Sequence, residues 1–216
     1  MNRTVAALEF CLAALLILGH NVWRVFPNEV PLLCVIAILS LRLRTGRFDF
    51  AQLGFRRPPS WGRIVVIALI AATLRILLSE LLVAPWAESV WGSPAEPEAA
   101  GKITGNLAHA LLALAIVWVF AGFGEEIAYR GYALNRGAAA LGASTAAFWL
   151  AAAVTSVLFG YGHFYKGFGG VIDSGMAGLI LAAAYLLSGR NLWTCVLAHG
   201  FIDSVAVAWT YLGLPD

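Results

Sequence analysis

The chain has 216 residues, of which 61% are hydrophobic and 12% are charged, and its formal net charge is +2. This charged fraction is about half that of an ordinary soluble domain. A soluble fold of this length could not bury so many apolar side chains, so a soluble globular protein is excluded. We expect a single integral membrane domain over residues 1–216.

Apolar runs long enough to cross a bilayer as helices, which takes about 20 residues, recur along the chain. The first run contains Glu9 and lacks a convincing signal-peptide cleavage site, which favours a retained span. The second is the shortest and least secure. The prediction is an all-α, polytopic membrane helix bundle of six to seven transmembrane helices, with eight as an open alternative. The expected spans are residues 4–20, 29–43, 62–85, 105–123, 143–163, 171–188 and 191–213.

Arginines are concentrated in one loop of the expected bundle. Six of the twelve fall between Arg42 and Arg63, between the second and third apolar runs. Such a run could also form a binding patch for a nucleic acid or an acidic partner. Its place between two spans favours a cytoplasmic loop instead, so no nucleic-acid partner is expected. The N-terminus is then cytoplasmic and the acidic linker, residues 87–106, lies outside. We expect a multi-pass protein of a cell membrane, typical of a bacterial inner membrane, surrounded by membrane lipids.

Several cysteines and histidines have no expected function. Cys11, Cys34 and Cys195 lie inside apolar runs without metal-site spacing, so we expect small buried apolar side chains and no disulfide framework. His20 and His109 are interpreted as headgroup contacts or satisfied core residues.

A cluster of charge follows the fourth apolar run, at Glu125, Glu126 and Arg130. A charged residue at the centre of a membrane helix costs roughly 2.5–3.5 kcal/mol, so such groups pair or face a wet cavity. Glu126 and Arg130 are four residues apart and share a helix face, which predicts an ion pair. Glu125 points about 100° away and stays available as a general base. The alternative is a solvated helix end in the headgroup region.

Two further polar positions interrupt apolar runs. His163 ends the fifth run, where a lone histidine is usually a headgroup contact or a satisfied core residue. His199 and Asp203 are four residues apart within the last run and therefore share a helix face. The rest of that run is mostly apolar and offers them no polar partner, so both side chains must find partners elsewhere. This pair is therefore the stronger functional candidate.

Together these residues form the patterns Glu-Glu-x-x-x-Arg, Phe-x-x-x-His and His-x-x-x-Asp, each on a separate expected span. The combination resembles the CAAX-prenyl-protease-like, bacteriocin-processing (CPBP, or Abi) group of intramembrane proteases. The resemblance covers residues 111–212, with a weaker match in the sequence Leu-Gly-Phe-Arg-Arg at residues 53–57. It places the catalytic core at about residues 105–213.

The resemblance implies an intramembrane endopeptidase that hydrolyses a peptide bond in a membrane-associated protein or peptide. By matching position, Glu125 would activate the attacking water, with assistance from His163. Glu126 and Arg130 would support the site through their ion pair.

The last motif would stabilise the oxyanion or polarise the scissile carbonyl. Asp203 stands where Asn is more familiar in the prenyl-protease branch, and an ionised Asp cannot donate a hydrogen bond. Asp203 is therefore either kept protonated, or orients His199, or binds something cationic. His199 is the better candidate donor.

The alternative is a divalent metal cofactor, for which zinc is the first candidate. Its ligands would be Glu125, His163, His199 and Asp203, which are suitable nitrogen and oxygen donors. The chain has no His-Glu-x-x-His motif, so metal-free catalysis is favoured.

Two other function classes stay open. A catalytically silent relative would act as a membrane binding or immunity factor. A proton-coupled transporter would also use intramembrane Glu and His, although no inverted hydropathy repeat supports one. A serine intramembrane protease needs a Gly-x-Ser-Gly motif, and Ser174-Gly175 lacks its first glycine.

Hydropathy alone separates the candidate residues across the bilayer. It places Glu125 near the cytoplasmic end of the fourth span and His163 near the far end of the fifth. Catalysis needs them close together. We therefore expect a kink at Gly122 and Gly124 that turns residues 125–138 back into the protein, in place of a simple descending and ascending helix pair.

Overall fold

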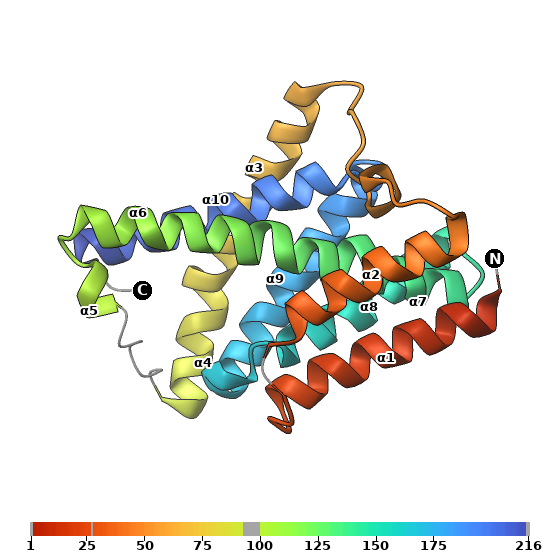
Figure 1. Ribbon diagram of the computed structural model, residues 1–216. Coiled ribbons are helices and arrows are strands. Elements are labelled where there is room, and N and C mark those ends of the chain that lie inside the picture. The colour runs from red at the N-terminus through yellow and green to blue at the C-terminus, as the bar shows by residue number, and fades with distance from the viewer. Residues whose placement is uncertain (1, 27, 93–99, 215–216) are drawn as a thin grey trace.

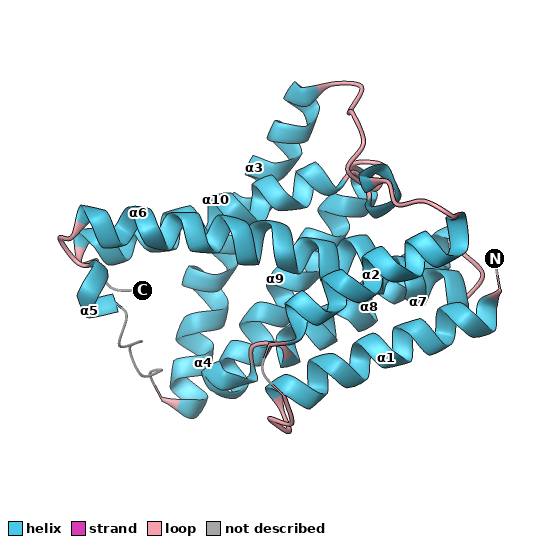
Figure 2. Ribbon diagram, in the orientation of Figure 1, coloured by secondary structure: helices cyan, strands magenta, loops and turns pink. Residues whose placement is uncertain are grey.

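The computed structural model describes residues 2–26, 28–92 and 100–214, and within these ranges all regular structure is helical (Figure 2). The elements are α1 (Arg3–Asn21), α2 (Glu29–Thr45), the 3-10 helix η1 (Phe50–Leu53), α3 (Trp61–Leu78), the π-helical η2 (Ser79–Val83), α4 (Ala84–Trp91), α5 (Ala100–Ile103), α6 (Leu107–Ile116), the π-helical η3 (Val117–Glu125) and η4 (Ile127–Leu134), α7 (Asn135–Ala140), α8 (Thr145–Tyr161), the 3-10 helix η5 (Phe164–Lys166), α9 (Gly167–Leu187) and α10 (Leu192–Leu212).

Several of these elements join into continuous helices long enough to cross a membrane. Those that combine the necessary length and apolar composition are Arg3–Asn21, Trp61–Trp91, Leu107–Ala140, Phe164–Leu187 and Leu192–Leu212. Helix α8 is also apolar but shorter, and α2 has 17 residues. The predicted polytopic helix bundle is confirmed.

Polar side chains fix where many of the helices begin. The side-chain oxygen of Ser60 accepts a hydrogen bond from the Arg63 backbone at the start of α3, and Ser144 does the same for α8. Such a cap satisfies an N–H group that the first helical turn leaves unpaired, and losing it typically costs about 1 kcal/mol. The same kind of cap is made by Asn2, Asn28, Asn106 and Asn191 for α1, α2, α6 and α10.

The 34-residue helix from α6 to α7 organises the bundle. Its first half packs against α10, and its second half packs against α1, α2 and α8 (Figure 1). Helices α8 and α9 also pack closely, because Gly160 brings its backbone against Val171 and Gly175 of α9. Small residues of this kind let membrane helices approach each other.

Some expectations differ from the structure. The third span continues as helix to Trp91, so it covers the first residues of the expected acidic linker, of which residues 93–99 lie outside the described residues. Only Cys195 is buried; Cys34 is partly exposed and Cys11 is exposed. Cys11 lies on a helix surface that hydropathy alone could not tell from the core.

The segment that weakly matched the family pattern, residues 53–57, docks on the start of α10. The Leu192 backbone N–H donates to the Gly54 carbonyl at 2.9 Å, and the Asn191 side chain donates to the Arg56 carbonyl at 2.9 Å. Phe55 packs on Trp193, with ring centroids 5.0 Å apart. This segment therefore fixes one end of the helix that carries His199.

Gly54 is the position in this segment where a side chain should do most harm. Its φ is +104°, and an added Cβ would lie 3.2 Å from the Arg190 carbonyl oxygen. We expect Gly54→Ala to lower the free energy of unfolding by about 1–3 kcal/mol, measured by thermal unfolding in detergent. Gly46→Ala is the matched control, because Gly46 also has a positive φ, +75°, but open space around its Cβ position. Equal losses in the two variants would contradict close docking at Gly54.

Candidate active site

Glu126 lies at the centre of a buried polar cluster. It is 0% exposed, and its Oε1 accepts hydrogen bonds from Arg130 Nη1 at 2.9 Å and from His199 Nδ1 at 2.7 Å. The other Arg130 nitrogen, Nη2, donates to the Gly178 carbonyl on α9 at 3.0 Å. The predicted Glu126–Arg130 ion pair is therefore present. In addition, it joins three of the long helices at one point.

Glu125 differs from its neighbour in its hydrogen bonding. Oε2 of each glutamate is buried without a hydrogen-bond partner among the described residues. Oε1 of Glu126 is held on both sides, whereas Glu125 makes no hydrogen bond or ion pair within the described part of the chain. The charges of His199 and Asp203 act on the Glu125 carboxylate. The side chain of Glu126 is thus held on both sides, whereas that of Glu125 has no hydrogen-bond partner among the described residues.

The helix has unusual geometry at these two residues. The π-helical segment η3 ends at Glu125, and the π-helical segment η4 begins at Ile127. π-Helical turns are rare and are often found at functional sites, because they rotate side chains away from regular α-helical spacing. The local geometry therefore supports treating residues 125–126 as the centre of the candidate site.

The ring of Phe159 holds the histidines and Arg130 around one side of the site. Its centroid lies 4.8 Å from that of His163, 6.1 Å from that of His199 and 4.5 Å from the Arg130 guanidinium carbon. Phe159 is 3% exposed. In the sequence it was only the first position of the Phe-x-x-x-His pattern, and the structure gives it a physical role as a packing platform.

His163 has one nitrogen bound and one free for hydrogen bonding. Nδ1 lies 3.0 Å from the Phe159 carbonyl oxygen, which can only accept, so Nδ1 carries the proton and Nε2 carries a lone pair. His163 lies in the turn between α8 and η5, outside the helical spans, and its burial lowers its pKa to about 4. The imidazole is therefore neutral at pH 7 and can accept a hydrogen bond through Nε2.

Asp203 lies on the far side of His199 from Glu126. Its Oδ2 is 3.7 Å from His199 Nε2, closer than the width of an intervening water but too far for a hydrogen bond. The expected shared face of His199 and Asp203 is confirmed. His199 therefore lies between two carboxylates. Its Nδ1 is hydrogen bonded to Glu126, and its Nε2 is beyond hydrogen-bond distance of Asp203.

The expected turn at Gly122 and Gly124 is wrong. The helix runs without interruption from Leu107 to Ala140. Glu125 lies 15 residues before Ala140, about 22 Å along the helix, and His163 lies 18 residues after Thr145, about 27 Å. A simple descending and ascending helix pair thus brings both residues to similar depth. Hydropathy ended the fourth span too early, because the buried polar residues after Phe123 resemble a helix end.

A second, partly buried ion pair was missed by the sequence interpretation. Arg75 on α3 pairs with Asp173 on α9, and the Ser79 hydroxyl donates to the same carboxylate at 2.7 Å. Both charges interrupt long apolar runs, so the reasoning applied to Glu125 would have found them. Helix α3, which carries Arg75, packs against α10, which carries His199 and Asp203.

The geometry of a metal site is not evident. Among the described residues, no group of three His, Cys, Asp or Glu side chains is arranged to hold a metal ion. Nδ1 of each candidate histidine is engaged, by a backbone carbonyl for His163 and by Glu126 for His199, so a metal would be bound through Nε2. No step of the chemistry below is therefore assigned to a metal.

Residues 107–205 match the family model described as type II CAAX prenyl endopeptidase, Rce1-like. The resemblance expected from the motifs is confirmed. The matched range contains every candidate site residue, namely Glu125, Glu126, Arg130, His163, His199 and Asp203. Neither the curated proteins nor the solved structures gave a match to the chain. The Rce1-like region supports a CAAX-type intramembrane protease in a multi-pass membrane protein.

Proposed function

We propose that the chain is an intramembrane endopeptidase in which Glu125 activates a water molecule against a peptide bond. The observation that carries this proposal is the contrast between the two adjacent glutamates. Glu126 is held by Arg130 and His199, whereas Glu125 has no partner among the described residues. A buried carboxylate without a partner is costly for structure and suited to general-base catalysis.

The proposed reaction uses the carboxylate of Glu125 first as a base and then as an acid. Glu125 takes a proton from water while the water oxygen attacks the scissile carbonyl carbon, which gives a tetrahedral intermediate. His163 Nε2 accepts the second hydrogen bond of that water and so orients it. The carbon–nitrogen bond then breaks, and Glu125 returns its proton to the leaving amine. Water is consumed, and a carboxylic acid and an amine are formed.

His199 is the proposed donor to the oxyanion. Its Nδ1 is fixed on Glu126, which directs Nε2 toward the side of the site where Asp203 lies. The gap of 3.7 Å to Asp203 leaves a proton on Nε2 available to a substrate oxygen that enters beside it. Of the three roles considered for Asp203, this geometry favours orientation of His199 and balance of its charge.

The proposed substrate is a protein or peptide held at the membrane. The matching family is described by its action on CAAX prenyl proteins, so a prenylated C-terminus is one candidate, alongside leader peptides and membrane-anchored regulators. The Asp in place of the more familiar Asn at residue 203 gives no reason to prefer one of these over another. The proposed activity therefore stops at peptide-bond hydrolysis in a membrane-associated chain.

The test is cleavage by the purified protein in detergent, using prenylated and unprenylated C-terminal peptides and a membrane-anchored leader peptide. We expect at least one to be cut. We expect activity to survive exhaustive chelation, because no three described His, Cys, Asp or Glu side chains are arranged to hold a metal ion. Mass spectrometry of the products identifies the bond. Loss of activity on chelation that only zinc restores would instead support the metal alternative. No cleavage of any substrate by a folded protein would favour the catalytically silent relative.

A further inference from the structure

Tyr129 is a buried tyrosine that the chemistry above does not use. It lies about one helical turn after Glu125, in η4. Its ring packs edge-on against the ring of Phe159, with centroids 4.9 Å apart. Phe159 in turn supports His163 through both its ring and its backbone carbonyl oxygen. Tyr129 therefore contacts the residue that holds His163.

The Tyr129 hydroxyl also reaches the backbone next to His163. A Cβ added at Gly162 would lie 2.6 Å from the hydroxyl oxygen, which is too close for two such atoms. The other close atoms belong to the preceding turn of α8, the nearest being the Phe159 carbonyl oxygen at 3.0 Å. The φ of Gly162 is −58°, which any residue can adopt, so the hydroxyl and not the backbone conformation favours glycine here. The hydroxyl thus closes the space beside the turn that carries His163.

Glu29, at the start of α2, holds the Tyr129 hydroxyl in place. The hydroxyl donates to Glu29 Oε1 at 3.4 Å, and the Asn21 side chain at the end of α1 donates to the same oxygen at 2.9 Å. Glu29 is buried, and His20 Nε2 lies 3.7 Å from its second oxygen. Because a buried carboxylate is costly without donors around it, this network favours one fixed position of the hydroxyl.

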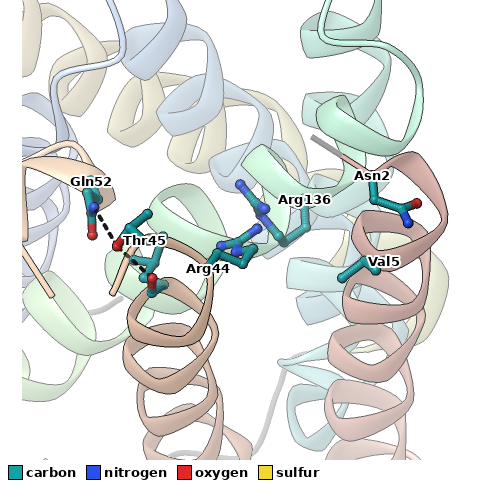
Figure 3. Close-up of a pocket in the computed structure, with 7 residues that line it drawn as sticks. Asn2, Val5, Arg44, Thr45, Gln52 and Arg136 are labelled. Carbon is teal, nitrogen blue, oxygen red and sulfur yellow. Dashed lines mark hydrogen bonds between the residues drawn. The ribbon is translucent and has the colours of Figure 1, made fainter. Parts of the chain in front are cut away.

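Helix α2 can serve as a fixed anchor because its other end is also held. There the Ser40 hydroxyl donates to Glu9 of α1, and Arg44 Nη1 lies 3.3 Å from Glu9 Oε2. Arg136 of α7 lies 3.5 Å from the same oxygen. Figure 3 shows Arg44 and Arg136 beside each other at a cavity of about 490 Å³ at this end of α2. The helix that carries Glu29 is therefore joined to α1 by polar contacts at both of its ends.

We propose that Tyr129 is a positioning residue, whose hydroxyl, anchored on Glu29, fixes the turn that carries His163. This inference rests on the proposed function, in which His163 Nε2 orients the attacking water. A hydroxyl held against Gly162 limits how far the turn can move toward the long helix. It thereby sets the distance between His163 Nε2 and a water beside Glu125. A displacement of about 1 Å in such an arrangement can lower a rate by about 100-fold.

The first test is the steady-state kinetics of Tyr129→Phe in detergent, with the prenylated, unprenylated or leader peptide that the wild-type protein cleaves. Phe keeps the ring against Phe159 and removes only the hydroxyl. We expect kcat to fall about tenfold and KM to stay within about twofold of wild type, because a looser turn misplaces the water and not the peptide. Tyr211→Phe is the matched control, because the Tyr211 hydroxyl, near the end of α10, makes no hydrogen bond within the described part of the chain.

A second measurement tests the contact itself and does not depend on turnover. Gly162→Ala places a methyl group against the Tyr129 hydroxyl, so we expect it to lower the thermal midpoint. Tyr129→Phe removes the obstructing oxygen, so we expect Gly162→Ala to lower the midpoint by less in that background. Effects of the methyl group on the backbone are common to both backgrounds and cancel in the comparison.

The possible results separate this role from the proposed function. Wild-type kcat in Tyr129→Phe, with a wild-type protein that cleaves, would overturn the positioning role and leave the proposed function standing. A higher KM with unchanged kcat would also overturn it, since it would place Tyr129 in substrate binding. Equal midpoint losses from Gly162→Ala in both backgrounds would show that the hydroxyl does not close this space. No cleavage by a folded wild-type protein would contradict the proposed function itself, and the positioning role with it.

Discussion

Replacing Glu125 with glutamine should reduce cleavage by at least 100-fold while leaving the protein folded and inserted. Gln keeps the size of the side chain but cannot take a proton from water, and a positioned general base typically contributes 10²–10⁴-fold to a rate. Glu125 makes no hydrogen bond or ion pair among the described residues, so the substitution breaks no contact that holds the bundle together. The measurements are the rate of peptide cleavage and the thermal midpoint of the same preparation.

A matched glutamate distinguishes this effect from a general loss of charge. Glu88→Gln removes one carboxylate from the exposed surface of α4, and we expect wild-type cleavage. Substantial activity in Glu125→Gln would show that Glu125 is not the base. A lowered thermal midpoint together with lost activity would move Glu125 to the group of supporting residues.

Replacing Arg130 with alanine should have the largest effect on stability. It leaves Glu126 buried at 0% exposure with only His199 as a partner, and it also leaves the Gly178 carbonyl without its donor. Removing one partner of a buried ion pair costs about 3–5 kcal/mol. We expect a fall in yield and in thermal midpoint, measured by detergent-solubilised unfolding. Glu126→Gln should lower the yield and the thermal midpoint by less, because the amide oxygen of glutamine can still accept hydrogen bonds from Arg130 and His199.

The control for Arg130 is an arginine exposed on the surface of the bundle. Arg42→Ala removes the same charge from an exposed position on α2, and we expect little change in the thermal midpoint. Wild-type melting of Arg130→Ala would be incompatible with a supporting role for the ion pair. Cleavage by a folded Arg130→Ala protein would be reduced in any case, because His199 is held through the same carboxylate.

Short-range geometry within a helix could be predicted from the sequence. The Glu126–Arg130 ion pair and the common face of His199 and Asp203 follow from four-residue spacing alone, and both are present. The hydrogen bond between Glu126 and His199 could not be predicted in this way. It joins residues 73 positions apart, and it depends on how α10 packs against the long helix.

Helix ends were harder to predict where polar residues are buried. Hydropathy treated Glu125, Arg130 and Asn135 as the exit of the fourth span, although the helix continues to Ala140. Whether such polar residues stay inside a span depends on tertiary contacts, which a hydropathy scale does not include. The Asn135 amide, for example, donates to the Tyr185 hydroxyl on α9 at 3.0 Å. The same limit explains the misplaced kink at Gly122 and Gly124, which was needed only because the span ended too early.

The most direct test of the proposed activity is a comparison of membrane proteomes from cells that carry either the wild-type chain or Glu125→Gln. Membrane proteins are compared for uncut precursors and for new termini, with both forms of the chain present in equal amount. We predict that at least one membrane-associated precursor accumulates in cells with Glu125→Gln and that its cleaved form is found only with the wild-type chain. Identical precursors and termini in the two membranes would contradict glutamate-dependent proteolysis by this protein.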